Sequence, residues 1–150
     1  MTRRVIGALA ALAAFSARAD DQADLNRFNE ATVAQLQSMM QKGQLTSVEL
    51  TNFYIKRILR LDQNGPGVNA VIELNPDALA AAKTADDLRA KGKVLGPLHG
   101  IPVLLKDNID TGDKMQTSAG SFALVGRPAV RSSWARPTSP SGRISARSVR

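Results

Sequence analysis

The stretch GPLHGIPVLLKDNID, Gly96 to Asp110, carries the clearest structural pattern in the sequence. A Gly-Pro turn leads into the apolar run Ile101–Leu105, which has the length and composition of a fully buried β-strand. Lys106 ends this run, and polar residues follow at once. Because an ammonium group is costly to bury, a lysine at the end of such a strand requires an explanation.

Two explanations of Lys106 follow from the residues alone. In the first, its side chain extends to solvent or pairs with Asp107 or Asp110. In the second, it lies in a dry site where the amine loses its proton and can act as a base. Such groups commonly lie at the carboxyl ends of strands in α/β sheets, but the spacing by itself leaves both explanations open.

The residues before this stretch predict two helices. Capping boxes, in which a threonine is followed three residues later by Gln or Glu, predict where they begin: Thr32 with Gln35, and Thr46 with Glu49. Gly43 ends the first helix, and the turn at residues 65–67 ends the second. The second helix has an apolar face made of Leu50, Tyr54, Ile58 and Leu61.

Two strands flank a third predicted helix. Asn69–Leu74 is a short strand candidate, and Asn75 and Pro76 then begin an Ala-rich helix that Gly92 ends. The strand Ile101–Leu105 follows this helix. The alternation of strands and helices predicts an α/β fold in which helices cover a sheet. The Met39-Met40 pair is interpreted as helix core.

The amino terminus has the pattern of an export signal. A short basic start precedes an apolar core of 11 residues, Val5 to Phe15, and Ala17-Arg18-Ala19 matches the small-x-small cleavage site. We expect a signal peptide over residues 1–19, cleavage after Ala19, and a periplasmic or secreted protein that begins at Asp20. An ordinary Ala-rich first helix is the alternative.

The formal net charge of +7 comes from the two ends of the chain. The first 19 residues contain three arginines and no acids, and the last 24 contain six arginines and no acids. Residues 20–126 contain 11 basic and all 13 acidic residues, a net charge of −2. With one Trp and one Tyr there is no aromatic platform for bases, so we expect no nucleic-acid partner. We also expect no membrane association after signal cleavage, because the apolar core is too short to span a bilayer.

The sequence segments around Lys106 resemble those of one known family. GPLHGIPVLLKDNID is closely similar to the strand-and-lysine segment of the amidase signature family. The upstream QLTSVELTNFYIKRI and NAVIEL and the downstream TSAGSFAL are similar as well, so the resemblance covers about Phe28 to Val125. It implies an α/β fold with a mixed sheet covered by helices, of which this chain would be the incomplete amino-terminal part.

The resemblance also implies an activity, the hydrolysis of carboxamide C–N bonds by a Ser–Ser–Lys triad. Lys106 corresponds to the catalytic lysine, whose neutral amine takes a proton through a bridging serine held by a cis peptide and so activates the nucleophilic serine. The substrate of a full-length relative would be a small-molecule or peptide amide. No metal and no organic cofactor is implied.

This chain departs from the family at the serines. In the family they lie in a Gly/Ser-rich segment beyond the lysine, and the 44 residues after Lys106 contain no such segment. Ser132 and Ser133 have Arg-rich neighbours, and Ser118 and Ser121 match a segment other than that of the nucleophile. His99 is interpreted as structural, because no nearby group completes a His-based triad. A polypeptide of these 150 residues is therefore expected to be inactive.

Residues 127–150 change in character. They are rich in Arg, Ser and Pro, contain no acid or lysine, and are predicted to be disordered. Degenerate codons for Ala129 to Arg147, read one base out of frame, permit eighteen residues that begin Gly-Ala-Val-Ile-Leu-Gly. This out-of-frame sequence resembles the next segment of the amidase signature proteins, GAVILGKTNLSEWANFR. We therefore expect residues 20–126 to be the family portion and the rest to be a frameshifted tail, with a basic tail for an acidic partner as the alternative.

Three functions remain open from the sequence. The first is an amidase-type hydrolase by descent, and the second is a non-catalytic exported binding protein. The third is a relative of the A subunit of glutamyl-tRNA amidotransferase, against which the export signal argues because that substrate is cytosolic. A final expectation concerns folding: the strand Ile101–Leu105 would expose apolar surface and an unpaired edge in so short a chain.

Overall fold

The computed structural model describes residues 25–109, 111, 113–126 and 144–148. The chain forms two compact units, Met1–Ala31 and Thr32–Arg150. In the described end of the first unit, the guanidinium of Arg27 lies 4.9 Å from the ring centre of Phe28. The expected signal peptide and its cleavage site lie outside the described residues. Every helix and strand named below belongs to the second unit.

Helix α2, Val33–Gln41, begins where the sequence predicts. The backbone N–H of Thr32 donates to Oε1 of Gln35 at 2.8 Å, and the backbone N–H of Gln35 donates to the Thr32 hydroxyl at 3.3 Å. Gly43, with φ of 68°, follows the helix and ends it. Of the Met39-Met40 pair interpreted as helix core, Met40 is buried and Met39 is only half-buried.

Helix α3, Ser47–Arg57, starts at the second predicted capping box, between Thr46 and Glu49. Its continuation differs from the prediction, because Ile58–Gln63 forms the π-helix η1. The wider turns bring the carboxylate of Asp62 against the chain that enters the first strand. There it accepts hydrogen bonds from the backbone N–H groups of Ala70 and Val71 at 2.7 and 3.1 Å. A contact with a later segment thus replaces the regular α-helical turn.

Helix α4, Ala78–Ala90, begins later than the sequence predicts. Asn75 precedes the helix and does not cap it. Its side-chain oxygen instead accepts a hydrogen bond from the backbone N–H of Asp77 at 2.9 Å, which closes a turn before the helix. The other end agrees with the prediction, since Gly92 follows the last turn with φ of 70°.

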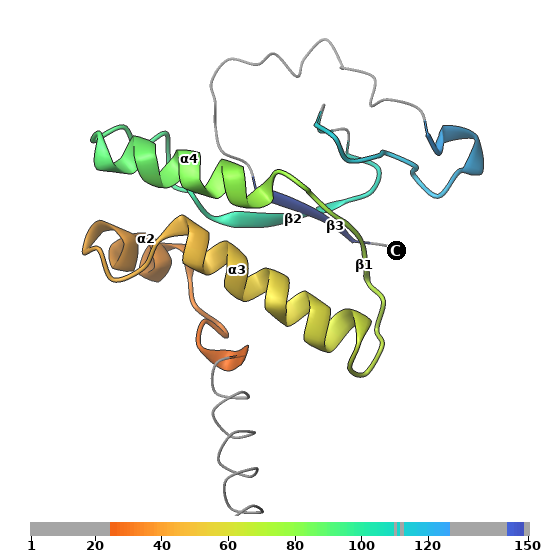
Figure 1. Ribbon diagram of the computed structural model, residues 1–150, viewed down its shortest axis with the longest axis horizontal. Coiled ribbons are helices and arrows are strands. Elements are labelled where there is room, and N and C mark those ends of the chain that lie inside the picture. The colour runs from red at the N-terminus through yellow and green to blue at the C-terminus, as the bar shows by residue number, and fades with distance from the viewer. Residues whose placement is uncertain (1–24, 110, 112, 127–143, 149–150) are drawn as a thin grey trace, which may run out of the picture. The chain divides into compact units, whose positions relative to one another are not determined.

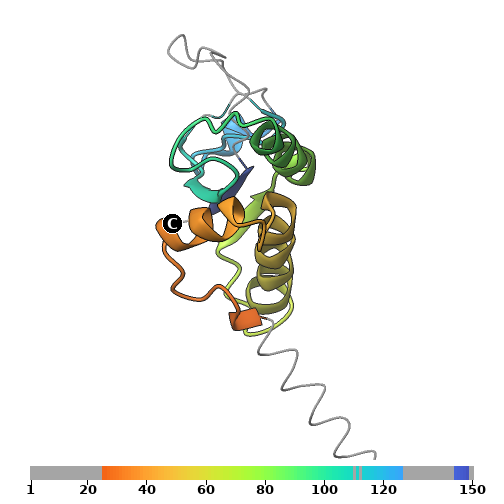
Figure 2. The same ribbon diagram turned by 90° about the vertical axis from the view of Figure 1, so that its left-hand side faces the viewer.

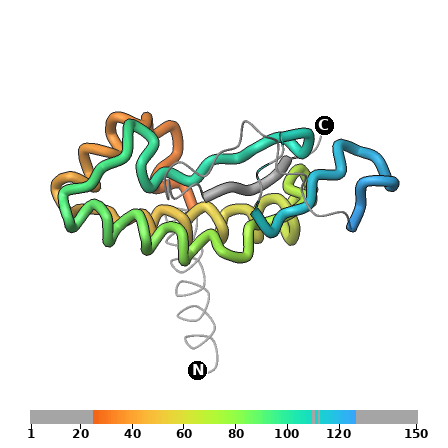
Figure 3. The backbone as a smooth tube through the Cα atoms, turned by 90° about the horizontal axis from the view of Figure 1, so that it is seen from above, coloured from red at the N-terminus to blue at the C-terminus, as the bar shows by residue number. Residues whose placement is uncertain are grey.

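The strands form a mixed sheet in the order β1-β3-β2. β1 (Val71–Leu74) pairs antiparallel with β3 (Ile144–Ser148), and β3 pairs parallel with β2 (Pro102–Lys106). Figures 2 and 3 show α3 and α4 running alongside each other on one side of the strands. The predicted α/β class, with a mixed sheet covered by helices, is confirmed.

Strand β3 is a correction to the sequence analysis, which predicts disorder throughout residues 127–150. Figure 1 shows it as the dark blue strand beside β2. The backbone N–H and C=O groups of β1 and β2 need partners, and the short segment of Ile, Ser, Ala and Arg in β3 offers them. β3 therefore gives β2 a paired edge that the sequence does not predict. The rest of the tail, residues 127–143 and 149–150, lies outside the described residues.

The prediction that the strand before Lys106 is fully buried is wrong, whereas the expectation that this strand exposes apolar surface in so short a chain is confirmed. Ile101 is buried, but Leu104 is 54% exposed. The reason is the position of β2, which lies at the edge of the described sheet with helices on one side only. An edge strand covered on one face alternates between covered and open side chains.

Candidate functional site

Lys106 is the last residue of β2 and is exposed. Its backbone lies opposite Ser148 of β3, and its carbonyl accepts a hydrogen bond from the backbone N–H of Ile109 at 3.0 Å. Within the described part of the chain, no residue accepts a hydrogen bond from its amine. The lysine therefore projects from a fixed backbone, and the described residues bring no hydroxyl to it.

The next residue, Asp107, is buried and held by a segment that returns to it from eleven residues later. The backbone N–H of Ser118 donates to one carboxylate oxygen at 3.2 Å, and the Ser118 hydroxyl donates to the other at 2.5 Å. Asp107 thus supports the lysine loop by hydrogen bonds. The neighbouring Asn108 is exposed.

Ser118 itself lies at the first position of a tight turn. The backbone N–H of Ser121 donates to the Ser118 carbonyl at 2.8 Å, and both residues between them have positive φ, 50° at Ala119 and 77° at Gly120. Two successive residues with positive φ at the centre of a turn are characteristic of type I′. Gly adopts this conformation freely, whereas Ala does so at a cost.

The segment between Asp107 and Ser118 is tied to β1 and to the start of α4. The side chain of Asp113 accepts hydrogen bonds from the backbone N–H of Met115 at 2.9 Å and from the Asn75 amide at 3.5 Å. The backbone N–H of Gln116 donates to Glu73 at 3.0 Å, and the Met115 side chain is almost completely buried. These contacts hold the returning segment beside the carboxyl end of β2.

The turn before β2 is built around His99. Its Nε2 donates to the backbone carbonyl of Ala85 in α4 at 2.9 Å, because a carbonyl can only accept. Its own carbonyl accepts from Gln37 of α2 at 2.9 Å and from Arg89 of α4 at 3.0 Å. The ring is buried and committed to helix backbone, in agreement with its interpretation as structural.

Gly100 brings the same turn against the first turn of α3. A Cβ at this position would clash with the hydroxyl of Ser47, and its φ of 77° favours glycine independently. The entry of β2 is therefore packed directly on the helices, while its exit carries Lys106.

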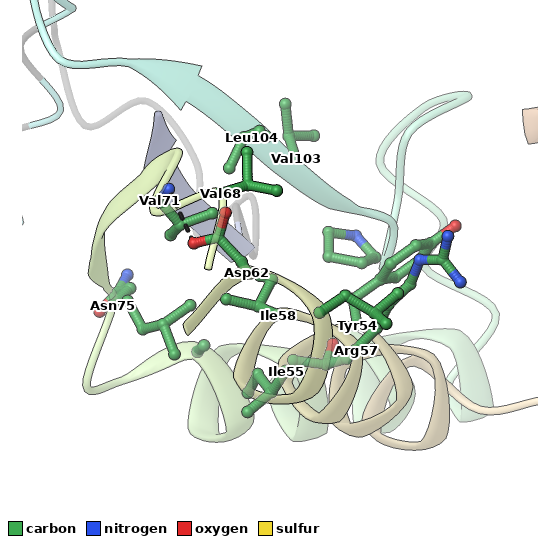
Figure 4. Close-up of a pocket in the computed structure, with 15 residues that line it drawn as sticks. Tyr54, Ile55, Arg57, Ile58, Asp62, Val68, Val71, Asn75, Val103 and Leu104 are labelled. Carbon is green, nitrogen blue, oxygen red and sulfur yellow. Dashed lines mark hydrogen bonds between the residues drawn. The ribbon is translucent and has the colours of Figure 1, made fainter. Parts of the chain in front are cut away.

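A cavity of about 460 Å³ lies between the helices and the first part of β2. Its lining comes from α3 and η1, among them Ile55 and Ile58, and from β2, including Val103 and Leu104 (Figure 4). The lining is mostly apolar, and Lys106 does not belong to it. The cavity is therefore separate from the lysine at the end of the same strand.

This cavity explains the predicted apolar face of the second helix. Leu50 is completely buried, whereas Tyr54, Ile58 and Leu61 line the cavity and are only half-buried. The apolar face predicted from the sequence is real, but the described residues cover only its first part.

The structure separates the serines that the sequence analysis considered. Ser118 lies beside the lysine loop with its hydroxyl bonded to Asp107, and Ser121 is exposed in the turn. Ser132 and Ser133 lie outside the described residues. The bond between Ser118 and Asp107 was not predicted, since two polar residues eleven positions apart carry no periodic signal.

The described residues contain no group of three or more His, Cys, Asp and Glu side chains that could hold a metal ion. In the same residues, no helix has the length and apolarity required to cross a membrane. The candidate site consists of Lys106, its neighbour Asp107 and the Ser118 turn that holds Asp107.

Comparison with known proteins identifies the family. The family model named Amidase matches residues 49–135, which is more than half of the chain and includes the whole candidate site. The chain belongs to the amidase family. The resemblance seen in the sequence is confirmed, and the matched range continues past Gly126, where we expect the family portion to end.

Individual amidases are similar to this chain in sequence or structure over part of their length. A putative amidase of Schizosaccharomyces pombe is 50% identical over 97 residues, which are 65% of this chain and 16% of that protein. The structure of the native peptide amidase from Stenotrophomonas maltophilia is 55% identical with a TM-score of 0.64, over 66% of this chain and 20% of that one.

The A subunit of a glutamyl-tRNA(Gln) amidotransferase from Chloroflexus aurantiacus is 42% identical over 103 residues, 68% of this chain and 20% of that protein. The chain thus spans about a fifth or less of the length of the relatives that it matches. The comparisons establish the family and the fold of the amino-terminal portion.

Proposed function

We propose that the chain is the amino-terminal part of an amidase-type hydrolase that cleaves the C–N bonds of carboxamides, with Lys106 as its catalytic lysine. The observation that carries the proposal is the position of Lys106 at the carboxyl end of β2, inside the range matched by the family and on a backbone fixed by Asp107. The 55% identity to a peptide amidase favours a small-molecule or peptide amide as the substrate class.

The proposed chemistry assigns one task to Lys106. Its uncharged amine accepts the proton of a bridging serine, which in turn accepts the proton of the nucleophilic serine as that oxygen attacks the amide carbon. The leaving amine departs with a proton, and water then cleaves the acyl-enzyme. Ser118 is not assigned as a nucleophile, because its hydroxyl already donates to Asp107. The two serines would come from the part of the domain that relatives have beyond the matched range.

We further propose that the residues after about Gly126 are translated out of frame. The support is the shifted reading of Ala129 to Arg147, which permits a text similar to the next amidase segment. Sequencing the gene tests this directly. One inserted or deleted base near Gly126 to Val130 should open a continuous amidase-like frame, and the absence of such a frame would refute the proposal.

Activity assays test the enzymatic part of the proposal. A polypeptide of these 150 residues should hydrolyse a simple amide no faster than background, and a frame-restored chain should be active. A serine-directed inhibitor should label the restored chain and leave the 150-residue chain unlabelled. Amide hydrolysis by the 150-residue chain would show that the serines were assigned to the wrong part of the protein.

We also propose export, since the first 19 residues have the pattern of a signal peptide. Amino-terminal sequencing of the exported protein should give Asp20 as the first residue, and an intact Met1 would exclude it. The same measurement bears on the less favoured alternative, a relative of the A subunit of glutamyl-tRNA amidotransferase, to which the chain is 42% identical, against 50% and 55% for the amidases. A protein of that kind must remain in the cytosol with its tRNA substrate. A non-catalytic exported protein would instead be exported and remain inactive after the frame is restored.

A further inference from the structure

We propose that Ser118 is a positioning residue for Lys106 and that it acts through the carboxylate of Asp107. The inference rests on the proposed function, because it concerns the lysine assigned there as the base. Ser118 does not contact Lys106 in the structure. It fixes the residue next to the lysine, and in this way the direction in which the lysine leaves the end of β2.

The first argument is the burial of Asp107. A carboxylate that is almost completely buried is stable only when its oxygens receive hydrogen bonds. Ser118 supplies one bond to each oxygen, from its backbone N–H and from its hydroxyl. The hydroxyl bond, at 2.5 Å, has the short length of a charge-assisted bond.

The second argument is the backbone conformation that aims Ser118. The turn places Ala119 at φ of 50°, in a region that costs a non-glycine residue free energy. Such a conformation persists only where surrounding contacts determine it. The bonds from Ser118 to Asp107 are contacts of this kind. They form only when the backbone N–H and the hydroxyl of Ser118 both point toward the carboxylate of Asp107.

The third argument connects Asp107 to the lysine. The Lys106 carbonyl accepts a bond from the backbone N–H of Ile109, so the residues from Lys106 to Ile109 form one turn with Asp107 inside it. Fixing the side chain of Asp107 restricts the peptide that joins it to Lys106, and this peptide sets the direction of the lysine Cα–Cβ bond. Preorganised groups of this kind support catalysis by holding a reactive side chain in place.

Amide hydrogen exchange of the 150-residue chain tests the brace, the pair of bonds from Ser118 to Asp107, without any assay of activity. In Ser118→Ala, the amide of Ile109 should exchange about tenfold faster, since a hydrogen bond to a charged group is lost. Ser118→Thr retains the hydroxyl and should stay within about twofold of the unchanged chain. Ser121→Ala is the matched control, because Ser121 lies in the same turn and its exposed side chain does not bond Asp107.

Two results would overturn the brace. One is an unchanged rate at Ile109 in Ser118→Ala. The other is an equal rise throughout α3 and α4, which would mean that Ser118 supports the whole fold and not the lysine turn. Failure of Ser118→Thr to restore the slow rate would count against the hydroxyl and so against the proposal.

Kinetics of the frame-restored chain then test the effect on Lys106. Ser118→Ala should lower kcat about tenfold or more and leave KM within about twofold, as expected for loss of positioning in the transition state. A normal kcat in this variant would overturn the positioning role while the proposed function stands. If the restored chain hydrolyses no amide at all, the proposed function fails, and the exchange rate at Ile109 still decides whether the brace exists.

Discussion

The helical half of the fold (α3 and α4) and its sheet half (β1 and β2) differ in how completely their side chains are buried. Between α3 and α4, Leu50, Ala82 and Ala85 are fully buried. In the sheet, Leu104 and Ile72 are about half exposed, and Leu104 lines the cavity. The helices thus bury side chains against each other, while the sheet leaves apolar side chains partly exposed. The candidate catalytic residue lies in the less buried half.

The largest effect should come from the sheet half and should concern activity alone. In a frame-restored chain, Lys106→Ala should lower kcat/KM on the order of a thousandfold or more, because members of such a triad act as a unit. Lys106→Arg should be almost as inactive, since a guanidinium does not give up its proton. Initial rates on a simple amide measure the loss, and circular dichroism should show an unchanged fold. Full activity of either variant would contradict the role of Lys106.

The second effect concerns Gly100, where the two halves touch. Gly100→Ala should lower the free energy of unfolding by about 3 kcal/mol, because it combines a positive φ with a clash against Ser47. Gly92→Ala is the control, with φ of 70° and no atom within 4 Å of the added Cβ. It should cost only about 1 kcal/mol. Urea unfolding compares the two, and equal losses would show that the halves are not tightly packed at Gly100.

A third test removes a contact inside the helical half. The carboxylate of Asp86 in α4 accepts the backbone N–H groups of Ser47 and Val48 at 2.7 and 3.1 Å, at the start of α3. Asp86→Ala should destabilise the chain by about 1–2 kcal/mol, because it leaves the helix terminus without these acceptors. Asp86→Asn retains one acceptor and should lose less. Stability unchanged in Asp86→Ala would mean that Thr46 alone is sufficient to cap α3.

A fourth, smaller change should be stabilising. Ala119→Gly removes the strain of φ at 50° and adds flexibility to the unfolded chain, with a net gain of about 0.5 kcal/mol. Ala123→Gly, in the short 3₁₀ helix Phe122–Leu124, should have the opposite sign. Thermal unfolding measured on both variants decides the point. A loss of stability in Ala119→Gly would show that Ala119 makes a favourable contact in the turn.

The smallest effect should come from the exposed ion pair on α4. Lys83 and Asp87 lie 2.9 Å apart, with 70% and 56% of their side chains exposed. Lys83→Ala should therefore change the free energy of unfolding by no more than about 0.5 kcal/mol. The loss of unfolding free energy in Lys83→Ala should be smaller than in Asp86→Ala. This comparison distinguishes an ion pair on the surface from a capping bond between two helices. A larger effect for Lys83 would weaken that distinction.

The sequence predicted the features that depend on neighbouring residues. Both capping boxes formed as expected, because Thr32 and Thr46 need only a partner three residues later. The strand before Lys106 was found within one residue of its position, since an apolar run between a turn and polar residues is a local signal. The lysine itself was placed by resemblance to the family, which local chemistry alone could not supply.

The features that were missed depend on contacts between distant segments. The π-helix η1 follows from the bonds of Asp62 to residues eight and nine positions later, which helical periodicity does not contain. Ser118 reaches Asp107 through a turn whose strained Ala119 has no sequence signal. β3 was missed because Arg and Ser among its five residues suggest disorder, while the open edges of β1 and β2 offer it hydrogen bonds.

The order β1-β3-β2 has a consequence for the time at which the sheet can form. The ribosome makes β1 and β2 before their common partner, so both strands must wait for β3 to emerge. The helices can pack earlier, because α3 and α4 are adjacent in the chain apart from η1 and β1 and contact each other directly. We expect the sheet to close more slowly than the helices pack, because long loops between strands cost entropy to close. In the interval the nascent chain carries open strand edges, which can pair with other chains.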